Sequence, residues 1–281
     1  MRITAIFLIF FTAGAGIFAQ KATLTLEPVE RQMPAYIVER LSAQDRVLFD
    51  KLMRVGLEAA WSLVTAEGYP QNFINELSPL KANTRMVGRA RTMRYLPNRK
   101  DVREKLYSAG PQLNYKSAEE AQPGDVLVFD AGGETRAGVS GGVTTIRFLA
   151  RGGAGLVIDG AMRDVPELEA MPIQTYMRRG HASSVSPLMM SVDYQVPVRI
   201  GSVTVIPGDI LVGESTGILV IPAAIAEKVA NAALEHDEQE EFQREMLLTG
   251  ESIFGVYPTM NEAMRKRFEE WKAKKKVKSG K

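Results

Sequence analysis

The stretch from Gly155 to Asp164, Gly-Leu-Val-Ile-Asp-Gly-Ala-Met-Arg-Asp, joins an apolar run to a glycine turn that ends in a cation and a carboxylate. Residues 156–158 predict a buried strand, and Arg163 and Asp164 follow it side by side. A guanidinium fork can bind a substrate carboxylate, while an adjacent carboxylate can hold a hydrated divalent metal. A surface salt bridge within the turn is the alternative interpretation.

The distribution of apolar residues predicts strands and helices mixed within one domain. Strands are expected at residues 86–95, 126–129, 156–158 and 203–206, paired strands with glycine turns at 197–209 and 217–222, and short helices at 143–149 and 165–171. Ser42, three residues before Asp45, predicts a helix start, and apolar side chains at helical spacing continue that helix to Val64. Residues 27–40 predict an extended lead-in, and further helices are expected from Ala223 and over 260–271.

Composition limits the kinds of site that this chain can carry. With 281 residues, of which 45% are hydrophobic, it can bury a core. It has no cysteine, so disulfides, thiol nucleophiles and zinc-thiolate sites are excluded. A net charge of +2 argues against a nucleic-acid partner. Neither a Walker phosphate loop nor a dinucleotide-binding glycine pattern occurs, so no nucleotide cofactor is expected.

The N-terminus predicts export. A charged start at Arg2, an apolar run and a small-residue end at Ala19 are typical of a signal peptide at residues 1–19, and indicate a periplasmic or secreted protein. The apolar run at 5–19 is shorter than the roughly 20 residues of a membrane-spanning helix, so we expect cleavage and no stable membrane insertion afterwards. An uncleaved anchor is the alternative. The basic residues of 271–281 predict a solvated tail, or else a contact with anionic lipid or polymer.

Motifs on both sides of the Arg163 turn form an ordered series. They are Pro-Gly-Asp-Val-Leu-Val-Phe-Asp at 123–130, Ala-Gly-Val-Ser-Gly-Gly-Val-Thr-Thr at 137–145, and Gly-Ser-Val-Thr-Val-Ile-Pro-Gly-Asp at 201–209. From Met86 to Pro222 the series resembles the RraA-like family, which groups 4-hydroxy-4-methyl-2-oxoglutarate aldolases with the regulator of ribonuclease activity A. The resemblance implies an α/β fold: a single mixed domain of layered β-sheets and helices, of the swivelling β/β/α type.

The resemblance and the patterns described above together predict how the chain is organised. The signal peptide at 1–19 is followed by a lead-in at 20–41, the RraA-like domain at 42–258, and a C-terminal helix with a basic tail at 259–281. Helical extensions therefore flank the domain at both ends. The family also implies a homotrimer or a dimer of trimers.

The resemblance assigns roles to the two residues of the turn. Arg163 is expected to bind a 2-oxo acid substrate, and Asp164 a divalent cation, Mg²⁺ or Mn²⁺; both are the expected catalytic residues. The implied reaction cleaves a 4-hydroxy-2-oxo acid, or decarboxylates oxaloacetate, through a pyruvate enolate that a Lewis acid stabilises. A substrate-binding loop is expected just before a helix, where backbone N–H groups can receive an anion. Its residues are Gly141, Gly142, Val143 and Thr144.

Two positions depart from the family pattern. Gly142 stands where these aldolases commonly have an acid, and Thr216 stands where a second aspartate is common, although Glu214 keeps the first acid of that loop. The missing carboxylate could come from a neighbouring subunit or from nearby acids, namely Asp130, Glu134 and Asp159. His181, near several serines, is a further candidate for contact with the substrate.

Two rival functions share this scaffold. One is a non-catalytic regulator of the ribonuclease-inhibitor type, against which the predicted signal peptide argues, because RNA processing is cytoplasmic. The other is a lyase or hydrolase with a different substrate, suggested by Gly142 and by export.

Overall fold

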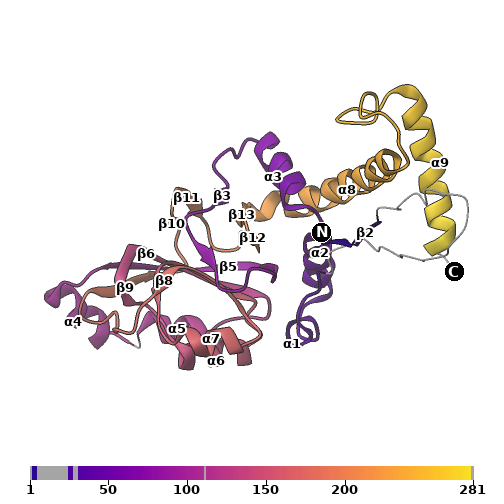
Figure 1. Cartoon of the computed structure of the whole chain (residues 1–281). Helices are drawn as coiled ribbons and strands as arrows, with labels where there is room; N and C mark the ends of the chain where they lie inside the picture. The colour runs from indigo at the N-terminus through magenta and orange to yellow at the C-terminus, as the bar shows by residue number, and fades with distance from the viewer. Residues whose placement is uncertain (1, 5–24, 28–30, 111, 280–281) are drawn as a thin grey trace, which may run out of the picture. The chain divides into compact units, whose positions relative to one another are not determined.

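A computed structural model describes residues 2–4, 25–27, 31–110 and 112–279 (Figure 1). The chain divides into two compact units: Gln32–Asp237, and Met1–Arg31 together with Glu238–Lys281. The domain limits at residues 42 and 258 stay a prediction. Apart from residues 2–4, the predicted signal peptide lies outside the described residues. Within the described part of the chain, no helix has both the length and the apolar character needed to cross a membrane.

The larger unit is built on a mixed sheet. Its centre is four parallel strands in the order β5 (Met86–Pro97), β6 (Asp125–Gly138), β7 (Gly155–Met162) and β8 (Gln174–Gly180). Antiparallel strands extend it: β9 (Met189–Tyr194), β12 (Ile210–Glu214), β13 (Gly217–Ile221), β3 (Phe73–Ile74) and β4 (Ser78–Pro79). A separate hairpin joins β10 (Val198–Ile200) to β11 (Val203–Val205), as the glycine turn predicts.

Helices pack on both faces of this sheet. One face carries α5 (Leu113–Glu119), α6 (Gly142–Ala150) and α7 (Val165–Ala170), which lie together in Figure 1. The remaining helices of the larger unit are α1 (Ala35–Val38), α2 (Ala43–Arg54), α3 (Leu57–Ala66), α4 (Lys100–Ser108), the short 3₁₀ helix η1 (Ala223–Ile225) and the first part of α8 (Ala226–Leu248). The mixed α/β class predicted from the sequence is confirmed.

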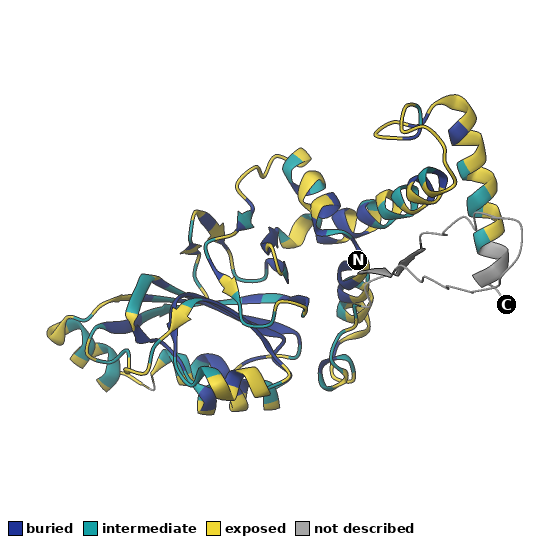
Figure 2. Ribbon diagram, in the orientation of Figure 1, coloured by how far each residue is buried: buried dark blue, intermediate teal, exposed yellow. Residues whose placement is uncertain are grey.

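Alternating side chains of β6 reach two different hydrophobic cores. Val126 and Val128 join the core that contains β12, β13, α2 and α3, whereas Leu127 and Phe129 join the core under α6 and α7. Successive side chains of a strand point to opposite faces, so a strand covered on both sides is apolar throughout. The central strands are accordingly dark blue in Figure 2, and the outward helix faces are yellow.

Two local expectations are wrong. The lead-in is not extended throughout, because it contains α1 (Ala35–Val38). The single helix expected from Ser42 to Val64 is two helices, since Val55 and Gly56 adopt extended backbone conformations. The carboxylate of Asp237 accepts the Gly56 N–H at 2.6 Å and so caps the second helix from a distant part of the sequence. Ser42 does begin the first helix, accepting the Asp45 N–H at 3.0 Å.

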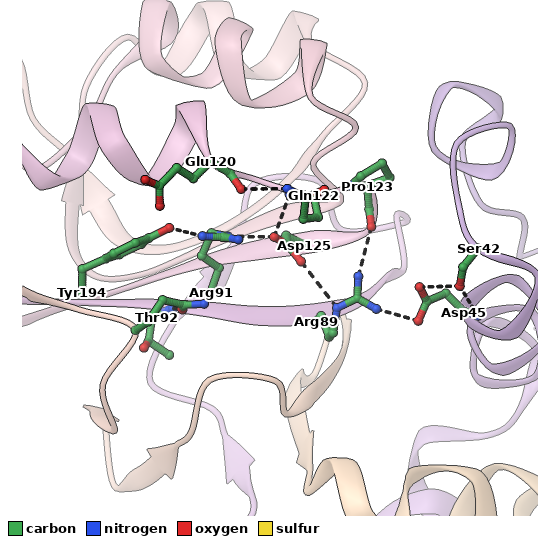
Figure 3. Close-up of polar contacts among 11 residues, drawn as sticks. Ser42, Asp45, Arg89, Arg91, Thr92, Glu120, Gln122, Pro123, Asp125 and Tyr194 are labelled. Atoms are coloured by element: carbon green, nitrogen blue, oxygen red, sulfur yellow. Dashed lines mark hydrogen bonds and ion pairs between the residues drawn. The ribbon is translucent and has the colours of Figure 1, made fainter.

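A network of paired charges links α2 to β5 and to the start of β6 (Figure 3). Asp125, of which the side chain is 6% exposed, accepts a hydrogen bond from Arg91 at 2.7 Å and lies 3.5 Å from Arg89. Arg89 also pairs with Asp45 of α2 at 2.5 Å, and Arg91 donates to the Tyr194 hydroxyl. We call these residues the Asp125 network. Each of its guanidinium groups has a carboxylate partner.

The smaller unit has a core of its own. The later part of α8 and α9 (Glu262–Ser279) contribute to it, and its buried residues are Phe242, Met246, Val256, Met260 and Met264. The Trp271 indole donates to Glu245 at 2.6 Å, and Lys275 pairs with Glu241 at 2.5 Å. A final helix was expected here and is confirmed. The same unit contains the antiparallel pair β1 (Arg2–Thr4) and β2 (Thr25–Glu27).

Candidate active site

The carboxyl ends of two neighbouring parallel strands bring the predicted site residues together. β6 ends at Gly138 and leads into the loop before α6, while β7 ends at Met162 and leads into Arg163 and Asp164. The two loops border a pocket of about 260 Å³. Ligands of open α/β sheets bind at this end of the strands. Of the six predicted site residues, only Gly142 is absent from the pocket lining, which contains Gly141, Val143, Thr144, Arg163 and Asp164.

The backbone of Arg163 is held in place, whereas its side chain has no partner among the described residues. Its N–H donates to the Ser140 carbonyl at 2.9 Å. Gly138 packs against it so closely that a Cβ there would lie 2.8 Å from the Arg163 backbone nitrogen. The Nε atom of Arg163 is buried without a hydrogen-bond partner, and no carboxylate among the described residues pairs with this guanidinium. A partly buried guanidinium that lacks a carboxylate partner and lines a pocket is suited to bind an anion.

Asp164 turns back toward the loop that begins α6. It has left-handed backbone angles, φ 56° and ψ 38°, which few residues other than glycine, asparagine and aspartate adopt. Its Oδ2 accepts the Gly142 N–H at 2.9 Å, while its other carboxylate oxygen receives no hydrogen bond from any described residue. One oxygen therefore fixes the side chain and the other remains available to a ligand.

The first turn of α6 also presents unused donors. The helix begins at Gly142, as the pattern at 143–149 predicts, and the Thr145 N–H closes back on the Gly141 carbonyl at 3.1 Å. Within the described chain, the N–H groups of Val143 and Thr144 meet no acceptor. Such groups at a helix N-terminus favour a negatively charged ligand.

Two of the acids considered as replacements for the missing carboxylate have structural roles. Asp159 is 2% exposed; it pairs with Arg178 and accepts the Gly201 N–H at 2.9 Å. Asp130 accepts the Arg199 N–H at 3.2 Å with one oxygen and a backbone N–H of its own turn with the other. Neither lines the pocket. Both carboxylates hold backbone N–H groups of neighbouring segments, Arg199 and Gly201, against β6 and β7.

The other acids named from the sequence are also occupied. Hydrogen bonds from Arg136 lower the pKa of Glu134 to about 2, which makes this carboxylate a weak base. Glu214 pairs at 2.7 Å with Arg85, whose side chain is almost fully buried, and lies outside the pocket. Thr216 lines a different hollow, with Trp61 and Phe73 among its neighbours.

Sequence reasoning missed several residues at this site. Side chains from the α4–α5 region and from the loop after β8 complete the pocket, among them Tyr107, Tyr115, Ser184 and Ser186. Their motifs carry no recognisable spacing, so only the fold brings them here. His181 does not line the pocket, and its Nδ1 accepts the Ser183 N–H at 3.0 Å. Glu167 was also missed: its carboxylate lies against Gly142, a contact that depends on the turn of the chain at Asp164 and that no sequence spacing signals.

The donor set fits a hard divalent cation. Within the described residues no three histidine, cysteine, aspartate or glutamate side chains form a metal-binding cluster. Mg²⁺ does not need such a cluster, because it keeps several waters and is commonly held by one or two carboxylates together with the substrate. Asp164 is oriented by the Gly142 N–H, and a Cβ on Gly141 would lie 2.4 Å from Asp164 Oδ2. The lack of a side chain at Gly141 thus leaves the space that this carboxylate occupies.

Comparison with known proteins places the chain in a family. The sequence model described as "RraA-like: Aldolase/RraA" matches residues 57–220, more than half of the chain, including both strands and both loops of the site. The chain belongs to the RraA-like family. The resemblance stated from the sequence is confirmed.

Relatives of this RraA-like protein carry two kinds of name. A Halalkalibacterium halodurans protein named "Putative 4-hydroxy-4-methyl-2-oxoglutarate aldolase" is 31% identical over 171 residues, 60% of this chain and 75% of its own. A Thermus thermophilus protein named "4-hydroxy-4-methyl-2-oxoglutarate aldolase" is 31% identical over 138 residues, 49% of this chain and 76% of its own. The solved structure of Streptomyces coelicolor RraAS2, described as an unusual member of the RNase ES inhibitor RraA family, has a TM-score of 0.63 and 29% identity, and covers 73% of this chain and 98% of its own.

Proposed function

We propose that this RraA-like protein is a divalent-metal-dependent carbon–carbon lyase. Its substrates would be a 4-hydroxy-2-oxo acid resembling 4-hydroxy-4-methyl-2-oxoglutarate, and oxaloacetate. One observation carries the proposal: Arg163 is unpaired beside a pocket, next to an aspartate with one carboxylate oxygen still available. The aldolase names of the relatives support the same chemistry.

Each residue has a defined task in this proposal. Arg163 binds the substrate carboxylate with its planar fork, and Asp164 holds Mg²⁺ or Mn²⁺. The N–H groups of Val143 and Thr144 bind a second anionic group of a dicarboxylic substrate. A cation bound here would supply a Lewis acid for the negative charge that develops on the 2-oxo oxygen when the bond at C3 breaks. Aldol cleavage and decarboxylation develop the same charge, so one site serves both.

We further propose that the protein acts as a homotrimer or a dimer of trimers, and outside the cytoplasm. Two large apolar side chains at the start of α6, Val143 and Ile146, are 83% and 55% exposed beside the pocket, which supports burial against another copy. Light scattering of the purified protein gives the subunit number. N-terminal sequencing of the protein from a periplasmic extract tests cleavage after Ala19.

Pyruvate release tests the enzyme proposal. Metal-stripped protein is incubated with 4-hydroxy-4-methyl-2-oxoglutarate or with oxaloacetate, with and without Mg²⁺ or Mn²⁺, beside an Asp164→Ala variant. The proposal requires metal-dependent pyruvate that the variant does not release. Equal rates in the two proteins, or no pyruvate above the metal-only background, would refute it.

The likeness to RraAS2 supports a second candidate, a non-catalytic inhibitor of a ribonuclease. That role depends on surface contact rather than on the pocket. A ribonuclease inhibited equally by the wild type and by Asp164→Ala, together with absent lyase activity, would favour it.

A further inference from the structure

Glu167 brings a second carboxylate to the glycine pair at the start of α6. A Cβ built on Gly142 would lie 2.1 Å from Oε2 of Glu167, and one on Gly141 would lie 2.4 Å from Oδ2 of Asp164. The two acids are three residues apart, so they lie on the same side of the chain as it enters α7. Their carboxylates therefore approach consecutive residues of one loop.

Glu167 is an exposed residue that makes no polar contact through its carboxylate with any described residue. It is the third residue of α7, where a glutamate often folds back to accept the N–H of the N-cap residue. α7 has no side-chain cap hydrogen bond. Among the described residues, none donates a hydrogen bond to the Glu167 carboxylate and no cation pairs with it. Arg163, next to Asp164 in the sequence, forms an ion pair with neither acid.

The local charges favour a bound cation. The carboxylates of Asp164 and Glu167 both lie beside the N-terminus of α6 and repel each other. The partial positive charge of that N-terminus offsets this repulsion only in part. Mg²⁺ and Mn²⁺ prefer carboxylate oxygens and can be held by two of them, with water completing the shell. Asp164 lines the pocket and Glu167 does not, so of the two acids only Asp164 borders the space for the oxo acid.

We propose that Glu167 is the second protein carboxylate of the divalent cation site centred on Asp164. Residue 142 is then glycine because Glu167 fills the space that a side chain there would take. The inference rests on the proposed function and deepens it, since it names a further residue of the same site. It also explains how this chain keeps two acids at the site without one at position 142.

Binding of Mn²⁺ to the metal-stripped full chain tests the assignment without any assay of turnover. Electron paramagnetic resonance titration compares the wild type with Asp164→Ala, Glu167→Gln and Glu169→Gln. Glu169 is the matched control, because it is an exposed acid on the same short helix. We expect Glu167→Gln to raise the Kd of Mn²⁺ at least about tenfold, and Glu169→Gln to bind as the wild type does.

A relocated carboxylate gives the sharper test. Adding Gly142→Asp to Glu167→Ala should restore most of the affinity that Glu167→Ala loses, since the shortened side chain at 167 frees the space that the new carboxylate enters. If Asp164→Ala weakens Mn²⁺ binding but Glu167→Gln keeps the wild-type Kd, the Glu167 assignment is overturned while the metal-dependent function stands. If the wild type and Asp164→Ala bind Mn²⁺ alike, the proposed metal site itself fails.

Discussion

Two groups of arginine and aspartate residues in the larger unit differ, because only one of them forms ion pairs within the described chain. In the Asp125 network, Arg89 and Arg91 share a buried carboxylate and have further partners on α2 and β9. At the turn after β7, Arg163 and Asp164 are adjacent in sequence but do not pair, and the buried Nε of Arg163 has no acceptor. We infer that the Asp125 network has a structural role, because removing one partner of a buried ion pair is destabilising, and that the unpaired groups beside the pocket serve to bind a ligand.

Replacing Arg163 should affect catalysis most. Arg163→Ala removes the partner of the substrate carboxylate, so kcat/KM should fall about 10³-fold, or about 4 kcal/mol. Its melting temperature should hardly change, because no ion pair within the described residues is lost. Steady-state kinetics and thermal melts measure both. The control Arg91→Ala should lower stability and leave kcat/KM of the folded protein near the wild type. An Arg163→Ala variant that loses stability but keeps its activity would contradict the distinction between the two groups.

Replacing Asp125 should affect stability most. Asp125→Ala leaves two partly buried guanidinium groups without their shared carboxylate, which should cost about 3 kcal/mol of unfolding free energy. Urea titration at neutral pH gives this value. Pyruvate release per folded molecule should be retained. A large loss of activity in protein of wild-type stability would place the network in the catalytic machinery instead.

Crowding the Asp164 carboxylate should have an intermediate effect. Gly141→Ala puts a Cβ 2.4 Å from Oδ2, which displaces that oxygen from the Gly142 N–H. The Kd of Mn²⁺ should rise about tenfold, or about 1.4 kcal/mol. Gly110→Ala is the control, because a Cβ there meets nothing within 4 Å. Equal affinity in both variants would show that the position of Oδ2 does not matter.

Removing the charge of Glu134 should have the smallest effect. Hydrogen bonds from Arg136 lower the pKa of this carboxyl to about 2, so the contribution of the pair is present above about pH 4.5 and is lost as the pH falls toward 2. Arg136 is largely exposed, so Glu134→Gln should cost less than about 0.5 kcal/mol at pH 7. Kinetics should match the wild type. A hundredfold loss of kcat would make Glu134 the missing acid after all.

Local patterns predicted most of the elements around the site. The apolar runs at 126–129 and 156–158 lie within β6 and β7, and Gly141 precedes α6 as expected. The glycine turn expected after residue 158 is wrong, because Gly160 lies within β7 and the chain turns at Asp164 instead. Parallel neighbours bring their carboxyl ends to one edge, which is why Gly141 and Arg163 meet. The family resemblance, rather than any spacing, supplied the expected roles of Arg163 and Asp164.

Long-range contacts were beyond prediction from the sequence. The break between α2 and α3 is stabilised by Asp237, which lies 181 residues from Gly56. The ion pair of Asp159 with Arg178 and its hydrogen bond from the Gly201 N–H likewise depend on how strands and loops pack together. Glu167 was overlooked because its closeness to Gly142 depends on the left-handed backbone at Asp164, which turns the chain at that point.

Diffraction from crystals grown with Mn²⁺ and pyruvate would show whether Arg163 binds the oxo acid and Asp164 the cation. We expect an anomalous Mn²⁺ peak at ligand distance, about 2.1 Å, from the Asp164 carboxylate, with the pyruvate carboxylate hydrogen-bonded to Arg163. An Mn²⁺ peak elsewhere, with no anion against Arg163, would contradict it.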